Sequence, residues 1–289
     1  MNRREFLKRS MLAATGIVVG GTALSGLSGC QPKKKEKRIG LQLYSVREMM
    51  KADPKATLET IAGMGYKELE TAGYSDGKLY GFEPKEFGQI CADLGMSVSS
   101  CHTRHQSSLE DEAEVMAWWD RTFDDQLAAG CRYVFIPSMP IPATLDELKA
   151  ACNQYNRLGE MANGKGLALG FHNHAREFEK IEEEIMYDYM IANTDPDKFN
   201  FQMDVYWVLK GGYSPVDYLQ KYAGRFPVLH IKDESIIGES GALNFKEIFE
   251  AAYNQGMKDF YVEVEQYTQP VEVCVERSFD YLSAAEFVK

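Results

Sequence analysis

The five histidines of this chain gather at the ends of three short apolar segments, each of which is typical of a β-strand. They are His102 and His105, His172 and His174, and His230. Two further segments of this kind lead to carboxylates, which are Asp204, Glu263 and Glu265. Imidazole and carboxylate groups together bind Zn²⁺, Mn²⁺ and similar divalent ions. One such residue alone is often a hydrogen-bonded core group, but strand ends of this kind at five places predict one shared metal site.

The segments that carry these groups belong to a regular alternation of strand and helix patterns between Ile39 and Lys289. The strand-like segments are 39–44, 66–70, 96–101, 133–136, 167–171, 199–205, 227–231 and 260–265. Amphipathic segments between them predict helices, for instance at 54–64, 84–94, 111–129, 144–163 and 245–254. Eight such units in about 250 residues predict an α/β fold of the (β/α)₈ TIM-barrel type. A doubly wound open sheet is the alternative, but no G-x-G-x-x-G motif follows the first strand.

In a parallel barrel the loops after the strands converge, so side chains at the carboxyl ends of the strands face one mouth. The residues expected there are Gln42, Tyr44, Glu70, His102, His172, Asp204, His230 and Glu265. Side chains alternate along a strand, so His174 points the same way as His172. His174 and His102 are therefore candidates for acid–base catalysis. Gln42, Tyr44, Glu70 and the aromatic Trp207 are candidates for contacts with the substrate.

Alternation along the last two strands leaves three further assignments to make. Lys232 shares the inward direction of His230, which would place its ammonium over a substrate oxygen, although a surface ion pair with Asp233 is the alternative. Glu263 and Glu265 both face inward. We expect Glu265 to be the metal ligand because it lies nearer the carboxyl end, and Glu263 to orient a ligand or Lys232 during catalysis.

The first 38 residues predict export rather than folded structure. Residues 2–8 resemble a twin-arginine signal, and a short apolar stretch ends at Cys30 in a sequence typical of a lipoprotein cleavage box. We therefore expect residues 1–29 to be a signal peptide and 30–38 to be a charged tether that follows a lipidated Cys30. A stray cysteine after a weak signal anchor is the alternative. The single catalytic domain would occupy residues 39–289, in the periplasm or anchored to the outer membrane.

The charge of the chain argues against nucleic acid as a partner. The formal net charge is −11, and removal of residues 1–29, which carry four basic residues and one acidic residue, leaves about −14. A body this acidic repels the phosphates of DNA and RNA. The expected partner is a small molecule, and the membrane would be contacted only through the lipid on Cys30.

Several motifs resemble those of the xylose-isomerase-like sugar isomerase/epimerase family, which also includes inosose dehydratases and endonuclease IV. The motifs are LQLYSVR (41–47), GFHNH (170–174), MDVYW (203–207), HIKD (230–233) and VEVEQ (262–266). The resemblance implies a TIM barrel, often dimeric, that holds one divalent ion, commonly Mn²⁺, Mg²⁺, Co²⁺ or Zn²⁺. It places the ligands at His172, Asp204, His230 and Glu265. Endonuclease IV chemistry is not expected, because it needs a cluster of metals and a basic face.

One departure from the family pattern concerns the fifth strand, where sugar epimerases typically have a glutamate and this chain has His172. The expected chemistry is removal of a proton next to a carbonyl through an enediolate, which a Lewis-acid ion stabilises. Export and the lack of a glycine-rich phosphate loop favour a free sugar or a glycoside over a sugar phosphate. We expect a sugar isomerase or epimerase. A lyase that cleaves 3-keto-glycosides by elimination and a lipoprotein that only binds carbohydrate remain as alternatives.

Overall fold

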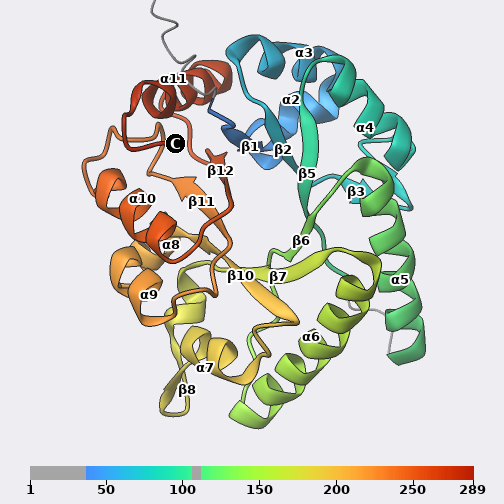
Figure 1. Cartoon of the computed structure of the whole chain (residues 1–289), viewed down its shortest axis with the longest axis vertical. Coiled ribbons are helices and arrows are strands. Elements are labelled where there is room, and N and C mark those ends of the chain that lie inside the picture. Colours follow the sequence, from blue (N-terminus) through green and yellow to red (C-terminus); the bar gives the residue numbers. More distant parts are fainter. Residues whose placement is uncertain (1–36, 106–111) are drawn as a thin grey trace, which may run out of the picture. The chain divides into compact units, whose positions relative to one another are not determined.

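The strands of the chain close into one parallel barrel, which is drawn in Figure 1. A computed structural model describes residues 37–105 and 112–289. The barrel order is β1-β12-β11-β10-β7-β6-β5-β2, and β1 pairs with both β12 and β2, which closes the ring. The strands are β1 (Gly40–Gln42), β2 (Glu68–Thr71), β5 (Ser97–His102), β6 (Tyr133–Ile136), β7 (Ala168–His172), β10 (Phe199–Asp204), β11 (Val228–Lys232) and β12 (Asp259–Glu263). The expected (β/α)₈ fold is confirmed.

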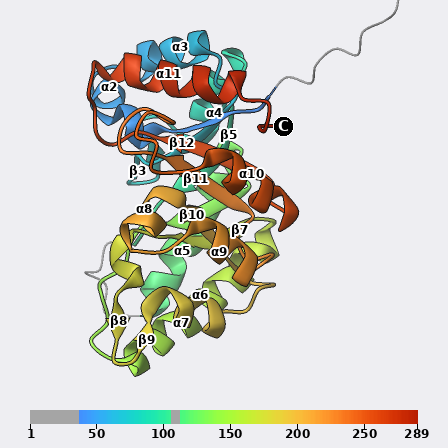
Figure 2. The ribbon, with the colours of Figure 1, turned by 90° about the vertical axis from the view of Figure 1, so that its left-hand side faces the viewer.

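Helices surround the barrel and join successive strands (Figures 1 and 2). The α-helices are α2 (Arg47–Ala52), α3 (Pro54–Met64), α4 (Pro84–Asp93), α5 (Glu112–Ala129), α6 (Leu145–Lys165), α7 (Met186–Asn193), α8 (Val205–Lys210), α9 (Pro215–Lys221), α10 (Phe245–Asn254) and α11 (Val271–Ala284). Two 3₁₀ turns, η1 (Leu43–Val46) and η2 (Ala175–Phe178), follow β1 and β7. Small hairpins form from β3 (Tyr74–Ser75) with β4 (Lys78–Leu79) and from β8 (Lys180–Ile181) with β9 (Glu184–Ile185).

Local sequence signals explain where several of these helices begin and end. The side chains of Asp53, Thr144 and Ser214 accept hydrogen bonds from the first turns of α3, α6 and α9, as good N-caps do. Gly166 ends α6 with a φ of 88°, a conformation that favours glycine. The helices expected at 54–64 and 245–254 match α3 and α10. The expected strand at 260–265 is shorter than predicted, because β12 ends at Glu263.

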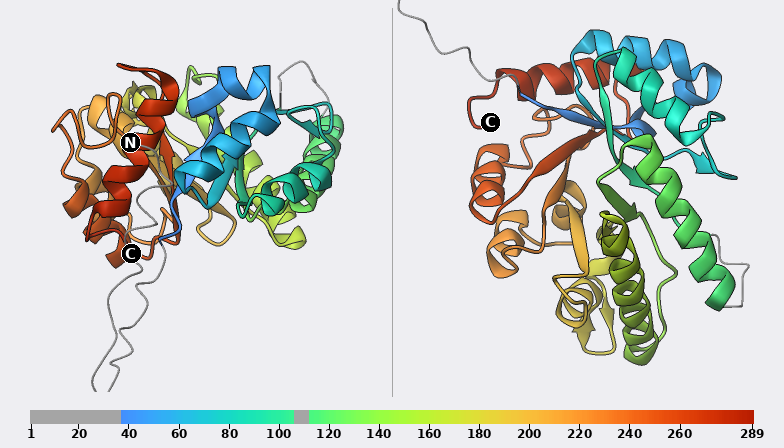
Figure 3. Two further views of the ribbon diagram at one scale, coloured as in Figure 1. Left: turned by 90° about the horizontal axis from the view of Figure 1, so that it is seen from above. Right: turned by 45° about the vertical axis from the view of Figure 1, so that its right-hand side comes forward.

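The hydrophobic residues form two separate cores. The larger one fills the space between strands and helices, and it includes Leu41, Leu69 and Val262. A smaller cluster of Phe135, Val228 and Tyr261 fills the interior of the barrel. The ring of Tyr66, which follows α3, packs against the ring of Phe279 on α11, with centroids 5.0 Å apart, and α11 lies beside α3 in Figures 1 to 3. The polar groups at the mouth therefore rest on a packed interior rather than on an open pore.

Strand register sets the height of the polar residues in the barrel. Asp204 on β10 pairs with His230 on β11, and Lys232 pairs with Glu263 on β12. On the other side, Gln42 on β1 pairs with Glu70 on β2. Because parallel neighbours in register lie at the same level, these side chains come together at the carboxyl end of the barrel, as expected.

The predicted signal peptide, Cys30 and most of the tether lie outside the described residues. Export and lipidation therefore stay predictions. Within 37–105 and 112–289, no helix is long and apolar enough to cross a membrane.

Candidate metal centre and cavity

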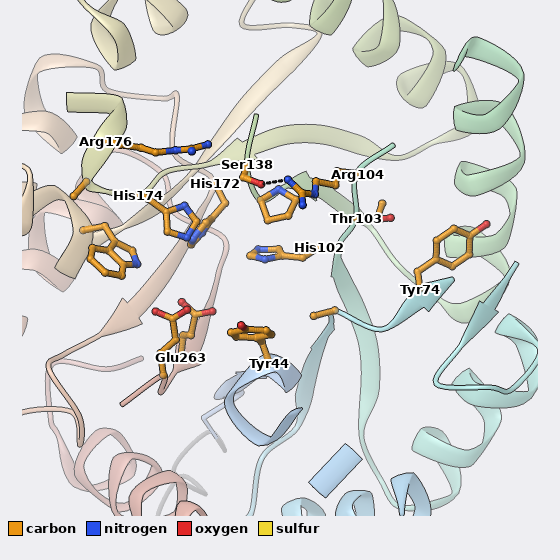
Figure 4. Close-up of a pocket in the computed structure, with 15 residues that line it drawn as sticks. Tyr44, Tyr74, His102, Thr103, Arg104, Ser138, His172, His174, Arg176 and Glu263 are labelled. Carbon is orange, nitrogen blue, oxygen red and sulfur yellow. Dashed lines mark hydrogen bonds between the residues drawn. The ribbon is translucent and has the colours of Figure 1, made fainter. Parts of the chain in front are cut away.

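A cavity of about 710 Å³ opens at the carboxyl ends of the barrel strands (Figure 4). Its floor includes His102 from β5, His172 from β7 and Glu263 from β12. Tyr44, His174 and Trp207, all expected at the mouth, also line it. The volume is in the range of sites that hold small organic ligands. The strand ends thus build one site, as the positions of the histidines predicted.

Four buried side chains could together hold a metal ion, and two of them, His172 and Glu263, line the cavity. One donor atom each from His172, Asp204, His230 and Glu263 lies within 4.8 Å of the others, and all four residues are buried. Asp204 Oδ2 is buried and has no hydrogen-bond partner among the described residues. A buried carboxylate oxygen without a partner is costly unless a cation or proton satisfies it. The nitrogen and oxygen donors of this group therefore fit a divalent ion.

His102, His172 and His230 form a second, overlapping group of three imidazoles. The ring centroid of His102 lies 5.0 Å from that of His230 and 4.8 Å from that of His172. However, His102 Nε2 is 2.7 Å from Gln202 Oε1 and 3.1 Å from a Glu70 oxygen, so this nitrogen already has protein partners. The four-residue group, which offers the unpartnered Asp204 oxygen, fits an ion better.

Glu70 is a buried carboxylate that contacts one of the four, His230, and several polar side chains around it. Its carboxylate accepts hydrogen bonds from the side chains of Gln42 and Gln202, at 2.7 Å each, and from the Ser100 hydroxyl. His230 Nε2 is 2.5 Å from Glu70 Oε1. Glu70 and Gln42 are both completely buried and do not line the cavity, so the structure does not place them where the expected substrate contacts would require.

Burial and neighbouring charges shift the pKa values of Glu70, His230 and Asp204 in opposite directions. Burial alone would raise the pKa of Glu70, but the positive charges of His102 and His230 hold it well below its usual range. Burial would lower the pKa of His230, yet Glu70 and Glu263 raise it. Burial raises the pKa of Asp204 to about 8, although Lys232 acts in the other direction. The metal-free site thus keeps protons that a cation would displace.

The expected order of the two last-strand carboxylates is reversed in the structure. Glu263, at the end of β12, belongs to the four-residue group, whereas Glu265 lies beyond the strand and its carboxylate is 2.7 Å from Lys232 Nζ. The Glu265 side chain is 25% exposed, against 5% for Glu263. The placement of Glu265 as a ligand is therefore corrected: the ammonium of Lys232 neutralises its carboxylate, which lines the cavity without joining the ligand group.

Lys232 itself is buried and does not line the cavity. Its ammonium lies 3.9 Å from Glu263 and 5.7 Å from the centre of the Trp207 ring. It has no direct path to a substrate oxygen, so its expected contact with substrate is not seen. The structure instead shows a buried cation that balances the charge of two acidic side chains.

Sequence reasoning missed several residues that matter here. Gln202 on β10 bridges His102, His172 and Glu70, with its Oε1 3.2 Å from His172 Nδ1. Its inward position follows from alternation with Asp204, which was the available signal. Arg104 lines the cavity from the loop after β5 and Arg176 from the short 3₁₀ turn η2, and periodicity carries no information in either segment. His105, by contrast, contacts the Trp118 ring as a loop residue and does not line the cavity.

Comparison with known proteins gives a consistent family match. The model of the family described as xylose isomerase-like TIM barrel matches residues 58–289. Inosose dehydratases from Geobacillus kaustophilus and Geobacillus thermodenitrificans are each 26% identical to the chain, over 196 and 171 residues. These matches cover 61% and 50% of this chain, and the chain spans only 60% and 55% of the length of the two relatives.

Solved structures extend the match over most of the chain. Two structures from Parabacteroides distasonis, both described as sugar phosphate isomerase/epimerases, are 36% and 31% identical, with TM-scores of 0.81 and 0.84. They cover 88% and 92% of this chain and are themselves covered completely. An L-ribulose 3-epimerase is 15% identical with a TM-score of 0.68, covers 85% of this chain and is itself covered to 93%, and it supports the fold alone.

Proposed function

Because the chain belongs to the xylose isomerase-like TIM barrel family, we propose that it is a divalent-metal-dependent enzyme that isomerises or epimerises a non-phosphorylated sugar. The observation that carries this proposal is the buried group of His172, Asp204, His230 and Glu263, of which His172 and Glu263 line an open cavity. A donor set that opens on a ligand-sized space suits catalysis better than a closed structural site would.

The proposed ligands are these four side chains, and the ion would be Mn²⁺, Mg²⁺, Co²⁺ or Zn²⁺. Two imidazoles with two carboxylates favour a transition metal or zinc over Mg²⁺, which prefers oxygen ligands alone. When bound, the ion supplies stabilisation of the negative charge that develops on a substrate carbonyl oxygen as the adjacent proton leaves. This first step would give an enediolate intermediate. Protonation of that intermediate at another carbon gives an isomer, and protonation on the opposite face of the same carbon gives an epimer.

Proton transfer would fall to side chains that line the cavity from different strands. His174 follows β7 and Glu265 follows β12, and β10 and β11 lie between those two strands in the barrel. Groups on separate sides of the substrate suit removal of a proton at one position and its return at another. His102 is a third group within the cavity. Tyr44 and Trp207 offer ring faces for the apolar side of a sugar.

Elimination is the second candidate reaction, and the named dehydratases among the relatives favour it. Loss of a β-substituent from the same enediolate would release water from a polyol ketone or an alcohol from a 3-keto-glycoside. His172 in place of the usual glutamate removes one carboxylate base from the site, which fits a reaction that needs proton removal but no return to carbon. The two reactions share their first step and differ only in the fate of the intermediate.

Solvent deuterium exchange tests the proposal directly. Protein loaded with Mn²⁺ is incubated in D₂O with free sugars and 3-keto-glycosides, and incorporation is followed by NMR and mass spectrometry. Exchange that stops when the metal is removed by a chelator, with the substrate left intact, supports an isomerase or epimerase. Metal-dependent cleavage of the substrate supports the lyase. Metal binding without exchange on any substrate would contradict an enzymatic role and favour a carbohydrate-binding protein.

We also propose that the chain acts outside the cytoplasm, anchored by a lipid on Cys30. The support is the arginine pair at residues 3 and 4 and the small residues before Cys30. Fractionation of cells that express the chain, with Cys30→Ser as the control, tests this. Equal membrane association of both forms would contradict the anchor.

A further inference from the structure

Two arginines lie on one wall of the cavity. Arg104 follows β5, and Arg176 lies in η2 after β7. Both line the same cavity as His172 and His174, and Figure 4 shows the two guanidinium groups on the side of the cavity away from Glu263. The cavity therefore has a cationic wall opposite its acidic one.

The loop after β6 holds both side chains. Arg104 Nη1 donates to Ser138 Oγ at 2.7 Å, and Arg176 Nη2 donates to the backbone oxygen of the next residue, Met139. Arg176 Nε also donates to Glu177 Oε1 at 3.1 Å. Since β6 lies between β5 and β7 in the barrel, the two arginines contact neighbouring residues of one loop from either side.

These contacts use only part of the donor capacity of the pair. A guanidinium carries five N–H donors in a planar fork. In the part of the chain that the structure describes, Arg104 uses one nitrogen, toward Ser138, and Arg176 uses two. The remaining donors have no protein acceptor there, although both side chains are fixed at one end. Fixed guanidinium groups with free donors are well suited to bind an anion.

Among the described residues, only one of the two arginines has an acidic partner. Glu177 pairs with Arg176, and no described carboxylate pairs with Arg104. Across the cavity, Glu263 contacts His230, and Glu265 forms an ion pair with Lys232. The chain as a whole has a net charge of −11, so its composition does not account for two arginines on one wall of the cavity.

We propose that Arg104, Arg176 and Ser138 form a subsite for an anionic substituent of the substrate. The proposal rests on the proposed function, since it assigns the end of the substrate away from the reacting carbonyl. A carboxylate matches the planar guanidinium fork, so the expected substrate is a sugar acid such as a hexuronate or its glycoside. Phosphate presents the same chemistry, and the experiment separates the two.

The test is calorimetric binding to the full chain treated with EDTA, so that a metal ion cannot capture the anion. Glucuronate is compared with glucuronamide, its neutral analogue, and with inorganic phosphate. We expect glucuronate to bind about 10-fold or more tightly than the amide, as charge-assisted hydrogen bonds predict. Arg104→Met and Arg176→Met should each reduce this ratio, while Arg104→Lys keeps part of it. Arg277→Met removes an exposed arginine on α11 and should leave the ratio unchanged.

Each outcome decides the proposal. Equal binding of acid and amide, or a preference that survives both methionine variants, overturns the subsite and leaves Arg104 and Arg176 as supports of the β6 loop. Phosphate that binds more tightly than glucuronate and is lost in the same variants upholds the subsite and assigns a phosphorylated substrate. Deuterium exchange is scored separately, so anion binding without exchange refutes the proposed function alone, and exchange without anion preference refutes this inference alone.

Discussion

The imidazole of His230 lies between two carboxylates, with Nε2 2.5 Å from Glu70 Oε1 and Nδ1 3.4 Å from Glu263 Oε2. Its Nδ1 side also faces Asp204, at 3.9 Å from Oδ2. If Nδ1 binds an ion with Asp204 and Glu263, the Nε2 proton is donated to Glu70. A carboxylate behind a metal-binding histidine fixes the ring and makes it a stronger ligand. Glu70 would therefore position His230 for an ion bound at this site, although the Glu70 side chain is buried and does not line the cavity.

Glu70→Gln should weaken metal binding while it preserves the fold. The substitution keeps the size of the side chain but removes the charge that holds His230, and loss of such a partner typically lowers metal affinity by about 10- to 100-fold. Affinity for Mn²⁺ or Zn²⁺ is measured by calorimetry. Glu68→Gln is the matched control, because Glu68 is also buried on β2 but pairs with Arg38, away from the ligands. Equal affinity in both variants would contradict the role of Glu70.

Glu263→Gln should lower the metal content of the protein, whereas Glu265→Gln should leave it unchanged. Glu263 belongs to the ligand group, so its amide variant should lose most of the bound ion, as should Asp204→Ala and His230→Ala. Glu265 pairs with Lys232, so its variant should keep the ion and lose activity instead. Bound metal is quantified by mass spectrometry, and circular dichroism verifies that each variant is folded. Retention of metal in Glu263→Gln with loss in Glu265→Gln would reverse the assignment.

The same pair shows where sequence-based prediction succeeds and where it stops. Alternation along a strand correctly indicates that Glu263 and Glu265 share a direction, but it does not reveal that β12 ends at Glu263. The end of the strand depends on its neighbours, and the competition of Lys232 for Glu265 depends on how deeply that lysine is buried. Both are properties of the packed barrel rather than of a local segment.

Strand positions were predictable because apolar runs and glycine-terminated helices are local signals. The ligand group largely followed from them, since His172 and Asp204 end their strands and His230 lies two residues before the end of β11. Glu70 was found at the mouth level but with the wrong role, because only the structure shows how many polar groups turn toward it. Arg104 lies in a loop, and its contact with Ser138 joins segments that sequence alone does not bring together.

Metal binding should release protons into solution. The pKa of Asp204 is raised by burial to about 8, and Glu70 and Glu263 raise that of His230, so both residues hold protons near pH 7 in the metal-free protein. A bound ion requires deprotonated ligands, so affinity should increase with pH between roughly 6 and 9.

Calorimetric titrations at pH 7 in buffers with different ionisation enthalpies measure this release. The apparent binding enthalpy should vary with the buffer and indicate about one proton or more per ion. Glu265→Gln, which leaves the ligand group intact, should show the same dependence. An enthalpy that is identical in every buffer would show that the ligands are already deprotonated.

The packing of α6 against the segment before β10 can be tested with two glycines of the same helix. A Cβ on Gly159 would lie 2.1 Å from the backbone oxygen of Lys198, whereas a Cβ on Gly164 would have nothing within 4 Å. Gly159→Ala should therefore destabilise the protein by about 1–3 kcal/mol, because the backbone that leads into the Asp204 strand must move. Gly164→Ala should stabilise it by up to about 1 kcal/mol, since alanine is the better helix former. Urea unfolding measures both, and shifts of the same sign would contradict the close approach of α6 to this segment.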